Sequence, residues 1–299
     1  FTDFVCGWPL FTLLIGGGIF LFIYSRALPL RKLGMAVSSL KMKKKGEGQV
    51  SSFQALMNTI SSTVGMGNIA GVAIALCVGG PGAIFWMWVS ALLGMATKFF
   101  EGTLAVMYKG KDDKGVAQGG PMFVLTEGIG RKMKPLAVMF AFCALFSGLP
   151  VMQANQLSES LYSVILEPLG VPESRWVFLV IGLVIGGIVS LVIFGGLKRI
   201  SQVSSKIVPF MVGFYFLMVL GIMIVYHDRL PAVFESIFKG AFCWKAGFGA
   251  FTAVALTGAR RAMFVTEAGV GTAGMMHGAS MNAEPVREGL VAMLGPAID

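Results

Sequence analysis

Long apolar segments alternate with short polar connections along most of the 299 residues of the chain. A helix needs about 20 predominantly apolar residues to cross the ~30 Å hydrocarbon core of a bilayer. Segments of about this length occupy residues 4–25, 53–78, 83–107, 135–157, 176–197, 206–226 and 244–265. The pattern predicts an all-α, polytopic membrane protein, because a lipid-exposed backbone must satisfy its own hydrogen bonds.

Two connections carry weaker helical patterns. Residues 121–130 and 232–238 are each expected to form a short helix outside the spans. A last apolar run starts at Gly289 and continues for about ten residues, too few to cross a bilayer.

Composition agrees with a membrane protein and argues against a soluble one. Hydrophobic residues make up 56% of the chain and charged residues 13%, against about 25% charged residues in typical soluble domains. The net charge of +9 does not indicate a nucleic-acid partner, because the basic residues lie in short connections between apolar runs. The expected surroundings are therefore the lipid bilayer, and no nucleic acid is expected as a partner.

The distribution of basic residues predicts an orientation. Most of the 24 Lys and Arg residues lie in or beside four connections, residues 26–50, 108–134, 198–205 and 266–288. Connections rich in Lys and Arg stay on the cytoplasmic side. We therefore expect these four loops in the cytoplasm and the N-terminus outside, in a multi-pass protein of the cell membrane.

The second span contains the most unusual stretch, SSTVGMGNIAG from Ser61 to Gly71. Each Gly costs about 1 kcal/mol in a helix interior relative to Ala. Close helix packing on small residues would explain Gly67 and Gly71, which are four apart. Packing does not explain why Asn68 and the neighbouring hydroxyl groups stand inside an apolar span. Helix packing and a binding site therefore both remain open as interpretations.

A break near Gly65 to Gly67 would create binding groups. The second half-helix would present free N–H groups and a partial positive charge to a substrate carboxylate. Carbonyl oxygens freed from the first half would suit a small cation such as Na⁺. The expected substrate-binding residues here are Thr63, Gly65, Gly67 and Asn68, and the expected cation-binding residues are Ser62, Gly65 and Asn68.

Other polar residues in or near the spans are given simpler interpretations. Lys98 and Glu101 are three apart and are expected to form an ion pair or to reach the interface. Glu267 is expected to be a gate or loop anchor. His277 is interpreted as a loop histidine without a metal role, since no second ligand lies at a suitable spacing.

Enzyme and channel functions lack sequence support. An intramembrane enzyme needs paired catalytic groups at membrane depth, and the spans contain neither H-E-x-x-H nor two aspartates. We therefore expect no catalytic residues, no cofactor, and no metal beyond a transported cation. A solute channel, kept as an alternative, would need a continuous polar stripe along several spans, which most of them lack.

Seven motifs, in order along residues 63–299, give the chain a family resemblance. They are TVGMGNIAGVAIAL (63–76), GGPGAIFWMW (79–88), GMATKFFE (94–101), GGPMFVL (119–125), VMQAN (151–155), GARRAMFVTEAGVGTA (258–273) and GLVAMLGPAID (289–299). Together they resemble the alanine or glycine:cation symporter family. The resemblance implies symport of small neutral amino acids, chiefly alanine and glycine, with Na⁺ or, alternatively, H⁺, by alternating access.

The resemblance also implies a fold and further site residues. The family's amino-acid transporter fold has two inverted five-helix repeats preceded by one extra helix. Here residues 4–25 would be the extra helix, 50–226 the first repeat and 244–299 the beginning of the second. The counterpart of the first break is then expected at Thr257–Gly258, and both residues are expected to bind substrate. The match to VMQAN adds Gln153 and Asn155 as substrate-binding residues.

Two departures from the family accompany the resemblance. Ala262 stands where the family has Gly, and Val265–Thr266 replaces Ser-Asn, so coupling or specificity is expected to differ if this segment lines the path. The chain also stops where the second helix of the second repeat would begin. About four helices of the implied fold are expected beyond it, with part of the cation site, and the oligomeric state is left undetermined.

Overall fold

The computed structural model describes residues 8–40, 46–113, 115–148, 151–242 and 248–299, and it is mostly helical. Its helices, in chain order, are α2 (Trp8–Tyr24), α3 (Leu28–Arg31), α4 (Leu33–Ser39), α5 (Ser52–Thr63), α6 (Met66–Gly79), α7 (Gly82–Met107), α8 (Pro121–Phe123), η1 (Val124–Ile129), η2 (Arg131–Met133), α9 (Lys134–Ser147), α10 (Val151–Leu161), η3 (Tyr162–Leu166), α11 (Arg175–Ile193), α12 (Gly196–Val225), η4 (His227–Arg229), α13 (Leu230–Ala241), α14 (Phe248–Thr266), α15 (Thr272–Gly278), α16 (Pro285–Ala292) and α17 (Gly295–Ile298). A small antiparallel hairpin of β1 (Gly110–Lys111) and β2 (Ala117–Gln118) pairs Gly110 with Gln118.

The expected apolar spans correspond to α2, the α5–α6 pair, α7, α9 with α10, α11, α12 and α14. Within the described residues, α7, α11 and α12 are long and apolar enough to cross a membrane singly. The α5–α6 pair qualifies as a fourth span, bent by 44°. The helical, apolar class predicted from the sequence is confirmed at this level.

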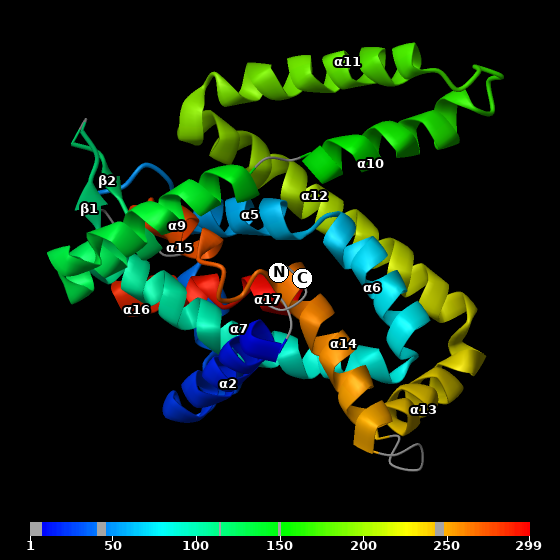
Figure 1. Cartoon of the computed structure of the whole chain (residues 1–299), viewed down its shortest axis with the longest axis horizontal. Helices are drawn as coiled ribbons and strands as arrows, with labels where there is room; N and C mark the ends of the chain where they lie inside the picture. The colour runs from blue at the N-terminus through cyan, green and yellow to red at the C-terminus, as the bar shows by residue number, and fades with distance from the viewer. Residues whose placement is uncertain (1–7, 41–45, 114, 149–150, 243–247) are drawn as a thin grey trace.

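Helix α7 is central to the packing. It contacts α2, α6, α13, α14, α15, α16 and α17, and several of these surround it in Figure 1. One core cluster joins it to α5, α12 and α16 through Leu56, Phe99, Val208 and Val291. Burial of such side chains stabilises contacts inside the bundle, although lipid removes much of the hydrophobic drive that operates in water.

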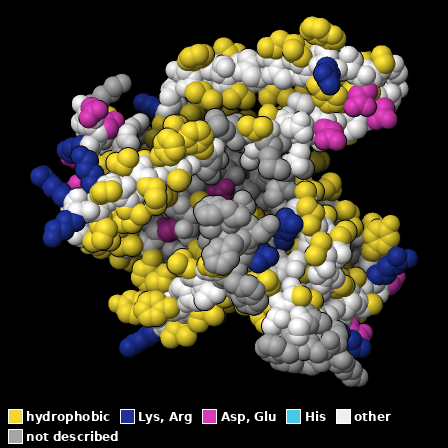
Figure 2. Space-filling model, in the orientation of Figure 1, with side chains coloured by type: hydrophobic (Ala, Val, Ile, Leu, Met, Phe, Trp, Pro, Cys, Tyr) yellow, Lys and Arg dark blue, Asp and Glu magenta, His cyan; other side chains and the backbone are white. Residues whose placement is uncertain are grey.

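Three polar connections meet at one end of the bundle, which we call the basic end and define by residues 46–50, 108–118 and 278–284. Gln49 N–H donates to Ala279 O at 2.8 Å, and the Lys109 ammonium donates to Ser280 O at 2.6 Å. An ion pair joins Lys111 to Glu47 at 3.2 Å. Figure 2 shows Lys and Arg gathered near the hairpin at this end. The connections predicted to share one side of the membrane therefore lie together.

The opposite end is closed by α13, the helix expected around residues 232–238. Its last turn packs on the start of α7, where Trp86 Nε1–H donates to Ala241 O at 3.2 Å. The ring of Phe85 contacts Phe238 and Phe242. Aromatic residues of this kind suit a membrane–water interface, where one side of the ring meets apolar groups.

One predicted loop is wrong. Residues 198–205 were expected to connect two spans, but they form the first turns of α12, which is 30 residues long. The turn lies earlier, around Phe194 and Gly195. Ser201 is buried in these turns and its side chain is bonded there: Ser201 Oγ donates to Leu197 O, and Asn58 Nδ2 on α5 donates to Ser201 Oγ at 2.6 Å.

The close contact between α7 and α16 yields a stability prediction. A Cβ on Gly102 would lie 2.7 Å from Ala292 Cβ and 3.2 Å from Gly289 Cα. Gly102→Val should therefore destabilise the protein by about 1–3 kcal/mol through overpacking. Thermal unfolding in detergent measures the effect as a lower melting temperature.

Gly182→Val on α11 is the matched control, because no atom of the described residues lies within 4 Å of a Cβ built there. Equal losses of melting temperature in the two variants would contradict the packing described for α7 and α16.

Candidate functional site

The glycine-rich stretch of the second span is a helix break. Helix α5 ends at Thr63, and α6 begins at Met66 with Gly65 as its N-cap. Val64 and Gly65 between the two half-helices have extended backbone, with φ of −74° and −164°. The break predicted at Gly65 to Gly67 is thus present, although its exact position starts one residue earlier.

A carboxylate from the far end of the sequence reaches this break. The Thr63 hydroxyl donates to Asp299 Oδ1 at 2.9 Å, and Asn68 Nδ2 donates to the main-chain oxygen of Asp299 at 3.3 Å. Helix α17 positions Asp299, whose own N–H donates to Gly295 O. Thr63, Asn68 and Asp299 therefore meet where α6 exposes the positive end of its dipole.

Two oxygens at this junction have unused acceptor capacity. In the described part of the chain, Asn68 Oδ1 and Asp299 Oδ2 are both buried and have no hydrogen-bond donor. A buried acceptor without a partner costs about 1–3 kcal/mol. A cation that prefers oxygen ligands would remove that cost for both atoms at once.

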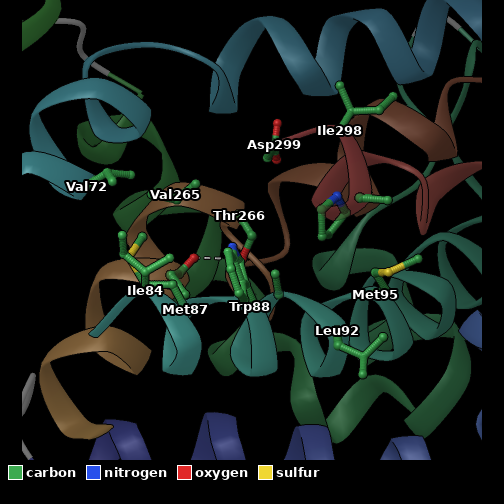
Figure 3. A pocket seen from close by; sticks show the side chains of 14 residues that line it. Val72, Ile84, Met87, Trp88, Leu92, Met95, Val265, Thr266, Ile298 and Asp299 are labelled. Carbon is green, nitrogen blue, oxygen red and sulfur yellow. Dashed lines mark hydrogen bonds between the residues drawn. The ribbon is translucent and has the colours of Figure 1, made fainter. Parts of the chain in front are cut away.

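A cavity of about 480 Å³ opens beside Asp299. Four helices contribute to its wall: α6 with Val72, α7 with Met87 and Trp88, α14 with Val265 and Thr266, and α17 with Ile298. Figure 3 shows Asp299 at one side of this group and the α7 side chains at another. The wall is mostly apolar, so a bound molecule would find its polar partners near Asp299, Thr266 and the helix break.

The predicted site residues differ in where the structure places them. Thr63 is buried and Asn68 half-buried at the junction, with Gly65 and Gly67 beside them. Ser62 is exposed, and its hydroxyl donates to Thr59 O rather than toward Asp299. The structure therefore gathers most of the first motif but leaves Ser62 apart from it.

The remaining predicted residues lie elsewhere. Gln153 and Asn155 are exposed on α10, and neither lines the cavity beside Asp299. Asn155 instead lines a separate hollow with residues of η3 and α11. That these two residues bind substrate stays a prediction.

The prediction of a helix interruption at Thr257–Gly258 is wrong. Helix α14 runs without a break from Phe248 to Thr266. Gly258 serves close packing there, since a Cβ would collide with Ala83 O and lie 2.8 Å from Trp86 Cβ on α7. A glycine in a helix allows either a break or a close approach, and the sequence alone did not separate the two.

The second break lies further on, between α14 and α15. Glu267, Gly269 and Gly271 have φ of +48°, +91° and +92°, so the backbone leaves the right-handed helix there. Glu101 on α7 holds this break, because Gly269 N–H donates to Glu101 Oε1 at 2.6 Å. Glu267 Oε2 accepts the Thr272 hydroxyl at 2.7 Å, as expected of a loop anchor.

The interpretations of Lys98 and His277 need correction. Lys98 is fully buried, forms no ion pair with Glu101, and its ammonium has no hydrogen-bond partner within the described residues. His277 lies on α15, fully buried, rather than in a loop. Both were misjudged because the α7–α15–α16 contacts that cover them join residues far apart in the sequence.

His277 belongs to a buried polar cluster near the basic end. Its Nδ1 lies 2.7 Å from Glu288 Oε1, while Glu288 Oε2 accepts Ser52 Oγ at 2.6 Å and Asn282 Nδ2 at 3.1 Å. Burial by itself would raise the pKa of the Glu288 carboxyl. The hydrogen bonds and the His277 charge outweigh burial, so that pKa lies below its ordinary value.

Comparison with known proteins adds a family. A sequence model described as the sodium:alanine symporter family matches residues 1–299. The sodium/alanine symporter AgcS of Methanococcus maripaludis is 39% identical over 307 residues, covering 100% of this chain and 66% of the relative.

Two Bacillus subtilis proteins are also similar. A putative sodium/proton-dependent alanine carrier protein, YrbD, is 39% identical over an alignment that covers 97% of this chain and 58% of the relative. A probable sodium/glutamine symporter, GlnT, is 33% identical over an alignment that covers 97% of this chain and 59% of the relative. The chain thus spans less than two thirds of the length of these relatives.

The Glu288 cluster predicts a pH-dependent stability. A carboxyl whose pKa falls on folding stabilises the folded state above its ordinary value of 4.5, and this contribution disappears as the pH falls through the lower folded value. Glu288→Gln should lower the melting temperature at pH 7, corresponding to about 1–3 kcal/mol. The difference from the wild type should shrink below about pH 4.5.

Glu127→Gln, at an exposed position in η1, is the control and should change little at any pH. Detergent melting curves over the acid range make the comparison. A Glu288→Gln variant with wild-type stability at pH 7 would show that the cluster contributes nothing.

Proposed function

The chain belongs to the sodium:alanine symporter family, whose members are transporters and not enzymes, and we propose that it moves a small neutral amino acid together with Na⁺ across the cytoplasmic membrane. The observation that carries this proposal is the convergence of Thr63, Asn68 and Asp299 on a helix break beside a cavity. A break supplies binding groups at membrane depth, which an unbroken helix lacks.

The cation is proposed to bind at the Thr63–Asp299 junction. The two buried oxygens without donors, on Asn68 and Asp299, are the ligand type that Na⁺ takes. Asp299 adds a negative charge that would offset the charge of the ion. We propose Na⁺ rather than H⁺ as the coupled ion because a proton would bind to one oxygen, whereas Na⁺ coordinates several oxygens at once.

The amino acid is proposed to occupy the adjacent cavity. A cavity of about 480 Å³ is within the usual range for ligand sites, roughly 300–1,000 Å³. Its carboxylate would face the N-terminal end of α6 and the bound cation. The apolar wall around Val72, Met87 and Val265 favours the small side chain of alanine or glycine over an amide, which would lose hydrogen bonds there.

The architecture proposed is a pair of inverted repeats, the first covering α5 to α12 and the second beginning with α14. Support comes from the break in α5–α6 and from the turn between α14 and α15, since each repeat would begin with an interrupted helix. Helix α6 contacts α14, and α5 contacts α15, as two interrupted helices lying side by side would. Alternating access would then move one repeat against the other, and the basic end is proposed to face the cytoplasm.

Uptake into liposomes tests the coupling. The purified protein should accumulate radiolabelled alanine when Na⁺ is high outside, and an H⁺ gradient alone should drive little uptake. Counterflow should be saturable, which separates a transporter from a channel. Equal accumulation with and without a Na⁺ gradient would contradict sodium coupling.

Substitutions test the site. Asp299→Asn and Asn68→Ala should each raise the Na⁺ concentration needed for half-maximal uptake by tenfold or more, equivalent to about 1.4 kcal/mol. Ser61→Ala is the control, because its hydroxyl only donates to Asn58 O one turn back. Unchanged Na⁺ dependence in folded Asp299→Asn protein would remove the carboxylate from the proposed cation site.

A further inference from the structure

Helix α5 lies alongside the segment formed by α16 and α17, and a side-chain hydrogen bond joins the two at each end. At the start of α5, Ser52 Oγ donates to Glu288 Oε2 at 2.6 Å. At its end, Thr63 Oγ1 donates to Asp299 Oδ1 at 2.9 Å. The partners of both bonds are 236 positions apart in the sequence. The two segments therefore run in the same direction and keep the same register over this length.

The equal separation follows from helix geometry. Helix α5 is continuous from Ser52 to Thr63, and Met293 and Leu294 keep right-handed helical backbone between α16 and α17. With a rise of about 1.5 Å per residue, the bonded positions of each segment lie about 16 Å apart. A slip of one residue would move a helix by about 1.5 Å and turn its side chains by about 100°, which the Thr63–Asp299 bond could not survive.

Apolar packing between the two segments does not fix this register alone. Leu56 and Ile60 of α5 share one buried cluster with Leu290 and Leu294. Burial of apolar surface is non-directional, so neighbouring registers bury similar side chains. A buried polar group that bonds across a helix interface does specify one register, as a single buried Asn does in a coiled coil. The Ser52–Glu288 bond is a polar contact of this kind.

Glu288 is held firmly enough to act as a fixed point. Its side chain is fully buried, with Oε1 2.7 Å from His277 Nδ1 and Oε2 also accepting Asn282 Nδ2 at 3.1 Å. The backbone of α16 lies directly against α7, since a Cβ on Gly289 would lie 2.5 Å from Phe99 O. Helix α16 is thus fixed on α7, and α5 takes its position from α16.

We propose that Glu288 is a positioning residue, which sets the register of α5 through Ser52 and so places Thr63 opposite Asp299. Glu288 acts on that junction only through the two helices, because it lies at their other end. The importance of this register for transport rests on the proposed function, which puts a cation at Asp299. A site of this kind depends on supporting residues that hold its ligands to about 0.5 Å.

Cross-linking tests the register without requiring transport. In protein whose four native cysteines are replaced, Thr63→Cys and Asp299→Cys put two thiols at the junction, where a short bifunctional thiol reagent should join them. These changes remove one of the two bonds, so the register then depends on the Ser52–Glu288 bond. Adding Ser52→Ala or Glu288→Gln should lower the yield by about threefold or more, and Ser52→Thr, which keeps the hydroxyl, should leave it high.

Thr59→Ala is the matched control on the same helix. Its side chain is buried like that of Ser52, but its hydroxyl donates to Ala55 O within α5. This variant should lose melting temperature, as Ser52→Ala should, while its cross-linking yield stays high. An equal loss of yield in Thr59→Ala would assign the effect to stability and overturn the positioning role.

Uptake by protein with its native Thr63 and Asp299 gives the second measurement. Ser52→Ala should raise the Na⁺ concentration needed for half-maximal alanine uptake by about tenfold, the lower end of what is lost when residues that support metal ligands are substituted. Ser52→Thr and Thr59→Ala should keep the wild-type Na⁺ dependence, and the maximal rate should change less than the Na⁺ requirement.

Three results would separate the claims. An unchanged cross-linking yield in folded Ser52→Ala protein would overturn the proposal, and this variant decides even if Glu288→Gln does not fold. A reduced yield beside an unchanged Na⁺ requirement would also overturn the positioning role. A reduced yield in protein without any Na⁺-dependent uptake would support the register set by Glu288 and contradict the proposed transport function instead.

Discussion

The organisation of the protein depends on satisfying polar backbone where helices are interrupted among apolar neighbours. Helix α5–α6 is interrupted, and α14 ends at Thr266 in a turn that leads to α15; both places free backbone groups that lipid cannot solvate. In each case a carboxylate from another element contacts the break: Asp299 at the first and Glu101 at the second. The breaks are therefore held by tertiary contacts, and any ligand that binds there competes with or completes them.

This constraint explains the central place of α7. It has to approach its neighbours closely enough for Glu101 to reach the second break, and small residues make the approach possible. Gly102 meets Gly289 and Ala292 on α16, and Gly94 meets Ala268 beside the break. Packing on small residues and polar contact are thus two parts of one interface, which agrees with how membrane helices associate.

Local features of the sequence predicted local structure well. The span expected at 83–107 is α7, from Gly82 to Met107, and the break near Gly65 followed from glycines beside polar groups. The same argument failed at Gly258, because a glycine that admits a neighbouring helix has the same local sequence as one that ends a helix. The long-range partners were also missed: Asp299 lies 236 positions from Thr63. The sequence signal for it was a carboxylate next to the apolar residues 289–298.

The length of helix α12 and its bond to α5 link two distant parts of the protein. Its 30 residues extend about 45 Å, more than the ~30 Å hydrocarbon core, and it continues unbroken from the basic end. The bond between Asn58 and Ser201 attaches its first turns to the half-helix that precedes the first break. The position of α5 and the first turns of α12 are therefore linked, while Pro209 removes one backbone hydrogen bond further along α12 and makes that part of the helix easier to bend.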